Sequence, residues 1–192
     1  MKYRIEKKLL IKQNNFFNFC KKYNIKKQFS DRYILSHYFD NKNLDMFYQS
    51  EEGILPRKKI RLRTYPKFFL DFESKNNYFY EEKSSDFFGR NKISKKINDI
   101  KLMINSGLWS NGYGRCSLTS SVFYRRQYFI YKQIRFTSDD MIYVRSKYKT
   151  KRISENIIEA KFDVSMLNFF ENIFQIKEKR FSKYCESIKT LY

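Results

Sequence analysis

The alternation of charged and apolar residues in several short segments is the feature that most limits what this chain can fold into. Residues 58–65 read KKIRLRTY, so that Lys59 and Arg61 share one face of an extended chain with Arg63, and apolar residues share the other. Successive side chains of a strand point to opposite faces, and this alternation therefore predicts a strand with one charged face. Similar patterns predict eight strands, over residues 2–12, 32–39, 58–65, 78–84, 119–132, 133–138, 141–147 and 156–162.

A second period, with apolar residues three and four positions apart, indicates a smaller number of helices. The predicted helices cover residues 14–27, 94–106, 165–177 and 182–192. Asn14 or Asn15 and Ser165 are the expected N-caps, and Gly107 the expected stop. Strands dominate and show no βαβ rhythm, so the sequence predicts an α+β fold with a largely antiparallel sheet, in a single domain over residues 1–192.

Three connecting segments complete the expected order of elements. Residues 41–57 and 111–116 contain Asn and Gly and predict connections. Ser138-Asp139-Asp140 predicts a turn between two strands, with Asp139 as the residue that caps it. His37 and Trp109 are interpreted as packing residues.

The composition excludes several functional classes. The 192 residues carry 40 Lys and Arg against 20 Asp and Glu, and 19% are aromatic, which excludes a disordered tail. No Walker or dinucleotide-binding motif is present, which disfavours P-loop and Rossmann enzymes. The three cysteines have no C-x-x-C spacing and predict free thiols in a reducing compartment, not a zinc site. No apolar run reaches about 18 residues, so we expect a cytoplasmic protein without a membrane span.

The net charge of +20 favours an anionic partner, and the placement of the charges narrows the choice. The tripeptide Glu-x-Lys recurs as Glu6 with Lys8, Glu81 with Lys83, and Glu159 with Lys161. One interpretation is a one-sided sheet whose charged face lies in water. The other is a closed sheet with helices on its apolar outer face and a wet, charged interior that holds a charged ligand. A chain of phosphates fits this interior, because Arg and Lys bind phosphate oxygens and Glu can hold a divalent metal.

Eight segments occur in an order that resembles a known family. They are RIEKKLLI (4–11), RYILSHYFDN (32–41), KIRLRTY (59–65), YEEKSS (80–85), YRRQY (124–128), IRFTSDD (134–140), IIEAKF (157–162) and RFSKY (180–184). In this order the chain resembles the VTC domain, the polyphosphate-polymerase branch of the triphosphate tunnel metalloenzymes, which is related to the CYTH domains. The resemblance implies a closed eight-stranded antiparallel β-barrel, the triphosphate tunnel, with flanking helices. It also implies an enzyme that transfers the γ-phosphate of ATP to a growing polyphosphate chain.

The resemblance further implies roles for individual residues. The basic residues that match catalytic positions of the family are Lys8, Arg61, Arg63, Lys83, Arg126, Arg135 and Lys183. Lys95 and Lys161 match further positions that bind the nucleotide or polyphosphate. Glu159 matches the glutamate that holds Mn²⁺ or Mg²⁺, with Glu6 and Glu81 as further candidate ligands. One departure is Ile97, where the family usually has arginine.

Two other functions stay open at this stage. The first is a metal-dependent triphosphatase of the same fold, acting on tripolyphosphate or nucleoside triphosphates. Hydrolytic relatives tend to carry E-x-E-x-K in the first strand, whereas this chain reads Arg4-x-Glu6-x-Lys8. The second is a non-catalytic polyanion binder that holds nucleic acid or polyphosphate through its net charge, although nucleic-acid binding leaves the Glu-x-Lys strands unexplained. ATP and inorganic polyphosphate are the expected partners, and the sequence does not identify protein partners.

Overall fold

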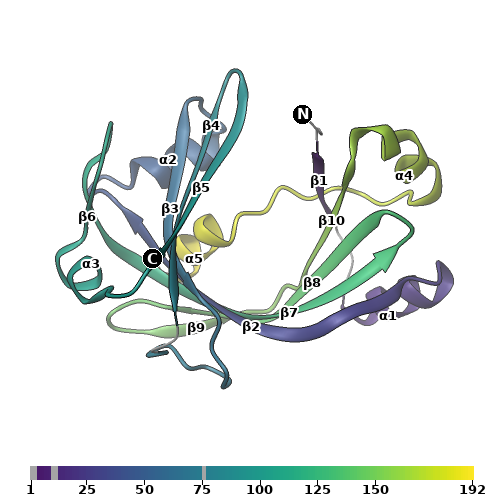
Figure 1. The fold of residues 1–192 in the computed structure, drawn as a ribbon, viewed down its shortest axis with the longest axis horizontal. Coiled ribbons are helices and arrows are strands. Elements are labelled where there is room, and N and C mark those ends of the chain that lie inside the picture. Colours follow the sequence, from purple (N-terminus) through teal and green to yellow (C-terminus); the bar gives the residue numbers. More distant parts are fainter. Residues whose placement is uncertain (1–3, 10–12, 75–76) are drawn as a thin grey trace. The chain divides into compact units, whose positions relative to one another are not determined.

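The computed structural model describes residues 4–9, 13–74 and 77–192, and strands dominate it (Figure 1). The strands are β1 (Arg4–Leu9), β2 (Lys26–Asp40), β3 (Arg57–Thr64), β4 (Tyr78–Asp86), β5 (Gly89–Ile97), β6 (Leu108–Ser110), β7 (Gly114–Tyr131), β8 (Ile134–Arg145), β9 (Thr150–Ile153) and β10 (Ile157–Asp163). The α-helices are α1 (Gln13–Lys22), α2 (Asp45–Glu52), α3 (Lys101–Ser106), α4 (Leu167–Ile173) and α5 (Lys183–Leu191), and a 3₁₀ turn, η1, covers Val164–Met166. No helix within the described ranges is both long and apolar enough to cross a membrane.

The strands pair in the order β1-β10-β8-β7-β2-β3-β4-β5, with β6 on β7 and β9 on β8. The pairings of β1 with β10, β10 with β8, β2 with β3, and β4 with β3 and β5 are antiparallel. The predicted α+β class with an antiparallel sheet is therefore confirmed. The described part of the chain has ten strands where eight were predicted, and the path has ends at β1 and β5, so these pairings do not establish a closed barrel.

Contacts along the chain divide it into two compact units. Unit 1 contains Met1–Arg32, Tyr124–Ile142 and Ser154–Phe181. Unit 2 contains Tyr33–Phe123, Tyr143–Ile153 and Ser182–Tyr192. The strands β2, β7 and β8 contribute residues to both units. The assignment of residues 1–192 to one domain stays a prediction.

In unit 1, helices α1 and α4 cover the apolar face of the sheet. Phe136 of β8 and Phe162 of β10 are buried against Phe170 of α4, and the rings of Phe162 and Phe170 stack at 4.5 Å between centroids. Phe16 of α1 packs edge-on against Phe129 of β7 at 5.2 Å. Alternation along β8 and β10 then directs the neighbouring residues, among them Arg135 and Lys161, to the opposite face.

In unit 2, the apolar side chains of β2, β3 and β7 form the interior. Ile60 and Leu62 of β3 are buried, as the alternation predicted. Leu35 and Phe123 pack with Phe72 in one cluster. His37 is buried here, with Nδ1 2.7 Å from the Ser121 hydroxyl, so it packs as predicted. Burial and the charge of Arg145 lower its pKa to about 4.

Several predicted boundaries are wrong, each for a local reason. Residues 94–97 belong to β5, because Ile97 pairs with Tyr78 of β4, and only Lys101–Ser106 are helical. Gly107 ends α3 as predicted, with its N–H donating to Met103 O. The connection over 41–57 contains α2, whose sequence DMFYQSEE has few apolar residues to reveal a helical period. Residues 111–116 are a connection only as far as 113, since β7 begins at Gly114.

Neither predicted helix N-cap is confirmed. Asn14 and Asn15 lie inside α1, which begins at Gln13 in the described chain. Asp163, not Ser165, caps the start of η1, since its Oδ1 accepts the Ser165 N–H at 3.1 Å. Ser182 caps α5 in the same way, with its hydroxyl accepting the Cys185 N–H.

Trp109 of β6, which was predicted to pack in the interior, is instead 78% exposed.

The turn predicted at residues 138–140 is also wrong. Strand β8 runs without interruption from Ile134 to Arg145, and the hairpin turn falls at residues 132–133, where Lys132 has a φ of 49°. Asp139 and Asp140 are buried in β8 and bind arginines of β7. Two adjacent aspartates usually indicate a turn, but here they are charge partners within a strand.

Candidate functional site

The first charged surface, here called the β3–β4 face, surrounds one buried carboxylate. Glu81 lies directly opposite Arg61 in the pairing of β4 with β3 and is 4% exposed. The Arg61 guanidinium donates from Nε at 2.7 Å and from Nη2 to the same oxygen, Glu81 Oε2. Arg63 Nε lies 3.8 Å from that oxygen, and Lys92 Nζ of β5 donates to Oε1 at 2.6 Å. Three cations therefore share one carboxylate.

This arrangement strongly favours the ionised form of Glu81. Burial alone would raise the pKa of the carboxyl, but the charges of Arg61 and Arg63 and the hydrogen bond from Lys92 outweigh it and lower the pKa to about 2. The carboxylate is consequently charged at neutral pH, and the face retains a surplus of positive charge.

A row of like charges crosses the same face. Lys59 of β3 lies opposite Lys83 of β4, and Lys83 lies opposite Lys92 of β5. Like charges that lie directly opposite each other destabilise a sheet. Lys59 donates to the Ser182 hydroxyl at 2.9 Å, and Lys92 is bound to Glu81, while Lys83 is exposed. Such a row is expected where an anion neutralises it.

Helix α5 adjoins the β3–β4 face through aromatic and hydroxyl groups. Arg61 Nη1 donates to the Tyr38 hydroxyl at 3.2 Å, and the Tyr38 ring stacks on Tyr184 of α5 at 5.2 Å. The Tyr184 hydroxyl donates to Asp40 Oδ2 at 2.5 Å. Lys183, predicted from the sequence, is the first residue of this helix and is half-buried.

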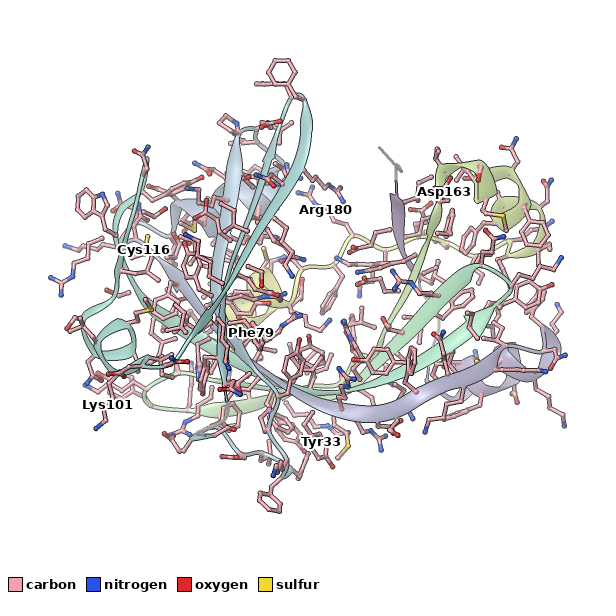
Figure 2. The ribbon with its side chains drawn as sticks, viewed as in Figure 1. Tyr33, Phe79, Lys101, Cys116, Asp163 and Arg180 are labelled. Atoms are coloured by element: carbon pink, nitrogen blue, oxygen red, sulfur yellow. The ribbon has the colours of Figure 1, made fainter. Side chains whose placement is uncertain are left out.

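Lys95 does not share the charged face of the β4–β5 hairpin. Its register partner is Tyr80, which alternates with Glu81 along β4 and so belongs to the opposite face. Lys96 instead pairs with Phe79 of β4, the residue labelled in Figure 2, and lies on the same face as Glu81. Ile97 pairs with Tyr78 and is half-buried.

The second charged surface, here called the β1–β10 face, lies in unit 1. Glu6 pairs with Lys161 and Lys8 pairs with Glu159, so each acid is opposite a base. Lys161 Nζ lies 2.6 Å from Glu159 Oε1 and 3.2 Å from Glu6 Oε2. Lys8 Nζ donates to the carbonyl of Phe181 at 2.5 Å and lies 3.9 Å from Glu6. This face is close to electrically balanced.

Arg126 and Arg135 extend the charged surface of unit 1. Arg126 binds Asp139 in a fork, Nε to Oδ1 at 2.6 Å and Nη2 to Oδ2 at 2.7 Å. Burial would lower the pKa of Arg126, but Tyr124 and Asp139 outweigh it and raise the pKa well above its usual value. Arg135 pairs with Lys161 and is exposed.

The residues of the β1–β10 face fit a divalent metal in part. Within the described residues no group of three or more His, Cys, Asp or Glu side chains could hold a metal ion. Glu6 and Glu159 nevertheless flank one lysine, and Mg²⁺ is commonly held by one or two carboxylates together with substrate phosphates. Thr137 pairs with Glu159, and its buried Oγ1 has no hydrogen-bond partner in the described part of the chain. Glu81, the third predicted ligand, belongs to unit 2 and contacts cations.

Sequence reasoning missed three residues of these surfaces. Lys92 was missed because the two-residue turn that forms the β4–β5 hairpin was not recognised. Asp139 was interpreted as a turn residue, although its alternation with Thr137 would have placed it beside Glu159. Tyr38 lies in the segment RYILSHYFDN, but sequence reasoning assigned it no binding role, and only its pairing with Arg61 indicates one.

Solved structures of several proteins share this fold. A candidate adenylate cyclase from Vibrio parahaemolyticus has a TM-score of 0.56 at 13% identity, with 98% of each chain covered. One from Bacillus halodurans has a TM-score of 0.59 at 13% identity, with 94% of each covered. A candidate adenylyl cyclase from Hippeastrum with a dominant triphosphatase activity has a TM-score of 0.56 at 11% identity, covering 99% of this chain and 96% of that one.

Sequence comparison identifies the family. No curated protein matches the chain. The model of the VTC domain matches residues 2–106, which include β1, the paired arginines of β3 and the Glu-x-Lys of β4. The match covers more than half of the 192 residues, and the chain therefore belongs to the VTC domain family.

Proposed function

We propose that this chain is an ATP-dependent inorganic polyphosphate polymerase, which transfers the γ-phosphate of ATP to a growing polyphosphate chain. The observation that carries the proposal is the surplus of positive charge on the β3–β4 face, where Lys59, Lys83 and Lys92 are opposed across three strands. A polyanion neutralises such a row, and membership of the VTC domain family supports phosphate as that anion.

Arg61 and Arg63 are proposed to bind oxygens of the transferred phosphoryl group and its neighbour. A guanidinium fork matches phosphate oxygens as well as carboxylate oxygens, so Glu81 holds both arginines in place before the substrate binds. Phosphoryl transfer needs positioning and charge neutralisation more than covalent chemistry from the protein. Lys83 and Lys183 would then bind the adjacent phosphates.

Glu159 and Glu6 are proposed to hold Mn²⁺ or Mg²⁺ together with phosphate oxygens. The metal would supply neutralisation of the charge that develops on the phosphates. Lys161 lies between the two carboxylates and would move to a phosphate when they take a cation. Lys8 would bind phosphate beside Glu159.

Arg126, Arg135 and Lys95 are proposed to make secondary contacts. The Nε and Nη2 atoms of Arg126 are already bound to Asp139, so a phosphate would bind through Nη1 or displace the aspartate. Arg135 and Lys95 are exposed and would guide the anion by charge.

A triphosphatase is the second candidate, because Glu6 and Glu159 flank the same lysine and could both serve one metal. If water, and not the end of the polyphosphate chain, accepts the phosphoryl group, the same transfer becomes hydrolysis. The Hippeastrum protein with this fold has a dominant triphosphatase activity. The acceptor, and not the binding surface, separates the two functions.

The test incubates purified protein with ATP and Mn²⁺ and measures ADP, free phosphate and long-chain polyphosphate separately. ADP matched by polyphosphate is expected, whereas ADP matched by free phosphate would identify the triphosphatase. Arg61→Ala and Glu159→Gln should strongly lower either activity. Glu155→Gln is the matched control, since Glu155 forms an exposed ion pair with Lys179 outside both faces. No turnover in the wild type, with polyphosphate binding unaffected by Arg61→Ala, would contradict both functions.

A further inference from the structure

The hairpin of β4 and β5 ends in two exposed aromatic residues. Asp86 pairs with Gly89, so the loop between the strands consists of Phe87 and Phe88 alone. Phe87 is 80% exposed and Phe88 is fully exposed. Figure 1 shows the hairpin as a long two-stranded element of unit 2, with this loop at its tip.

The turn does not require phenylalanine at these positions. Asp86 Oδ1 accepts hydrogen bonds from the N–H groups of Phe88 and Gly89, each at 2.9 Å. Gly89 has a φ of 147°, which residues other than glycine rarely adopt. Two-residue hairpin loops normally use Asn, Asp or Gly. The described fold buries neither ring, so the two phenylalanines contribute nothing to the turn or to the core.

Basic side chains follow the aromatic tip along the hairpin. Residues 83–96 contain five bases and one acid, Asp86, a net charge of +4; the bases are Lys83, Arg90, Lys92, Lys95 and Lys96. All five have exposed side chains, Lys92 with its ammonium bound to Glu81, and β5 pairs only with β4 among the described strands. Arg90 directly follows Gly89, and the lysines come at later positions of β5, with a rise of about 3.3 Å per residue.

We propose that the tip of this hairpin inserts into the surface of an anionic lipid bilayer. Interfacial segments bury aromatic side chains roughly 5–10 Å into the boundary between headgroups and acyl chains. Two rings at the tip, with Arg90 two residues after Phe88 and the lysines further back, match that order of apolar and anionic layers. A single-stranded nucleic acid would instead require the rings on the sheet surface, beside the basic side chains, so that bases stack on them.

The proposal is tested by lipid binding, which is independent of the proposed phosphoryl transfer. The protein is sedimented with vesicles of phosphatidylcholine alone or with added phosphatidylserine. Binding to the mixed vesicles is expected, with weakening at high salt because screening reduces the attraction. Phe87→Ser combined with Phe88→Ser should lower the partition coefficient of the protein between water and vesicles at least about tenfold. The reason is that the variant lacks the favourable free energy of transferring two aromatic rings from water to the bilayer. Phe68→Ser, at a residue 73% exposed elsewhere in unit 2, is the matched control and should leave binding unchanged.

A fluorescence measurement locates the tip directly. The chain has a single tryptophan, Trp109, so Phe88→Trp in a Trp109→Phe background places the only indole at the tip. A blue shift of its emission on phosphatidylserine vesicles is expected, and none in the presence of a single-stranded oligonucleotide. Thermal unfolding of every variant verifies that the fold is retained.

Three results would overturn the proposal. The first is equal vesicle binding by the wild type and the double serine variant. The second is oligonucleotide binding that requires both phenylalanines while vesicles are not bound. The third is self-association that the double serine variant loses in the absence of vesicle binding, which would assign the tip to a second copy of the chain.

Discussion

The two charged faces use the same tripeptide and reach opposite electrostatic results. On the β1–β10 face, Glu6-x-Lys8 lies antiparallel to Glu159-x-Lys161, and every acid is opposite a base. On the β3–β4 face, Glu81-x-Lys83 lies against Lys59-x-Arg61, so Glu81 meets arginine but Lys83 meets lysine. The partner strand, and not the motif, therefore decides whether a face neutralises itself or attracts an anion. The surplus of cations on the β3–β4 face is suited to binding phosphate. The two carboxylates of the β1–β10 face, Glu6 and Glu159, are suited to binding a metal ion.

The largest expected effect is loss of activity when the surplus is reduced. Arg61→Ala should lower kcat/KM by about 10²–10³-fold, the loss typical when a preorganised group on developing charge is removed. Steady-state ADP release from ATP measures it. Lys58→Ala is the control, because Lys58 binds Glu82 on the opposite face of the same hairpin at 3.0 Å. An equal loss in both variants would mean that the face of β3 does not matter.

The next effect concerns stability and contrasts the buried acid of the β3–β4 face with a partly exposed acid of the β1–β10 face. Glu81→Gln should destabilise the protein by about 3 kcal/mol, because it leaves Arg61, Arg63 and Lys92 without their shared charge partner. Glu6→Gln should cost less than about 1 kcal/mol, since the Glu6 side chain is partly exposed. Urea unfolding of both variants measures the difference. Equal losses would show that the burial of these carboxylates does not determine how much their ion pairs stabilise the protein.

The same carboxylate gives a pH dependence. The pKa of Glu81 is lowered to about 2 from 4.5, so its stabilisation is complete above pH 4.5 and is lost as the pH falls from 4.5 toward 2. The corresponding loss is on the order of 3 kcal/mol. The free energy of unfolding, measured as a function of pH, should not show this decrease between pH 4.5 and 2 in the Glu81→Gln variant. A wild-type profile that coincides with the variant's in this window would contradict the low pKa.

The smallest effect tests the helix beside the β3–β4 face. Ser182→Ala should destabilise the protein by about 1 kcal/mol, the usual cost of losing an N-cap. It also removes the acceptor of Lys59 Nζ, and so should alter polyphosphate affinity as well as stability. Asp163→Ala removes a comparable cap in unit 1 and should change stability alone. Isothermal titration with polyphosphate separates the two; equal affinities would show that Lys59 does not depend on Ser182.

Alternation predicted the strands well and the turns poorly. It located β3, β4 and β10 to within a few residues, since apolar and charged side chains differ strongly between the two faces of each. It missed β5, all but one of whose residues are exposed, so that no buried side imposes a period of two. The turn predicted at Asp139 rested on the local preference of aspartate for turns. In the structure the ion pair with Arg126 outweighs that preference, and the strand continues.

The placement of the candidate site residues on strand faces was predictable to a similar extent. Residues on well-patterned strands, such as Arg61 and Glu159, lie on charged faces as expected. Lys95 lies on the opposite face from Glu81, because alternation along β5 depends on the register that the Phe87-Phe88 loop sets. Register is a property of two strands, and a single segment of sequence does not contain it.

The interleaving of the two units has a consequence for truncation. Residues 2–106, where the family match lies, contain β1 and β2 but lack β10 and β7, the strands that pair with β1 and with one edge of β2. A polypeptide cut after residue 106 would expose unpaired edges on both strands, which is a known route to aggregation. The boundary of recognisable similarity is thus not a place where this molecule can be divided, and deletion studies of either surface need the complete polypeptide.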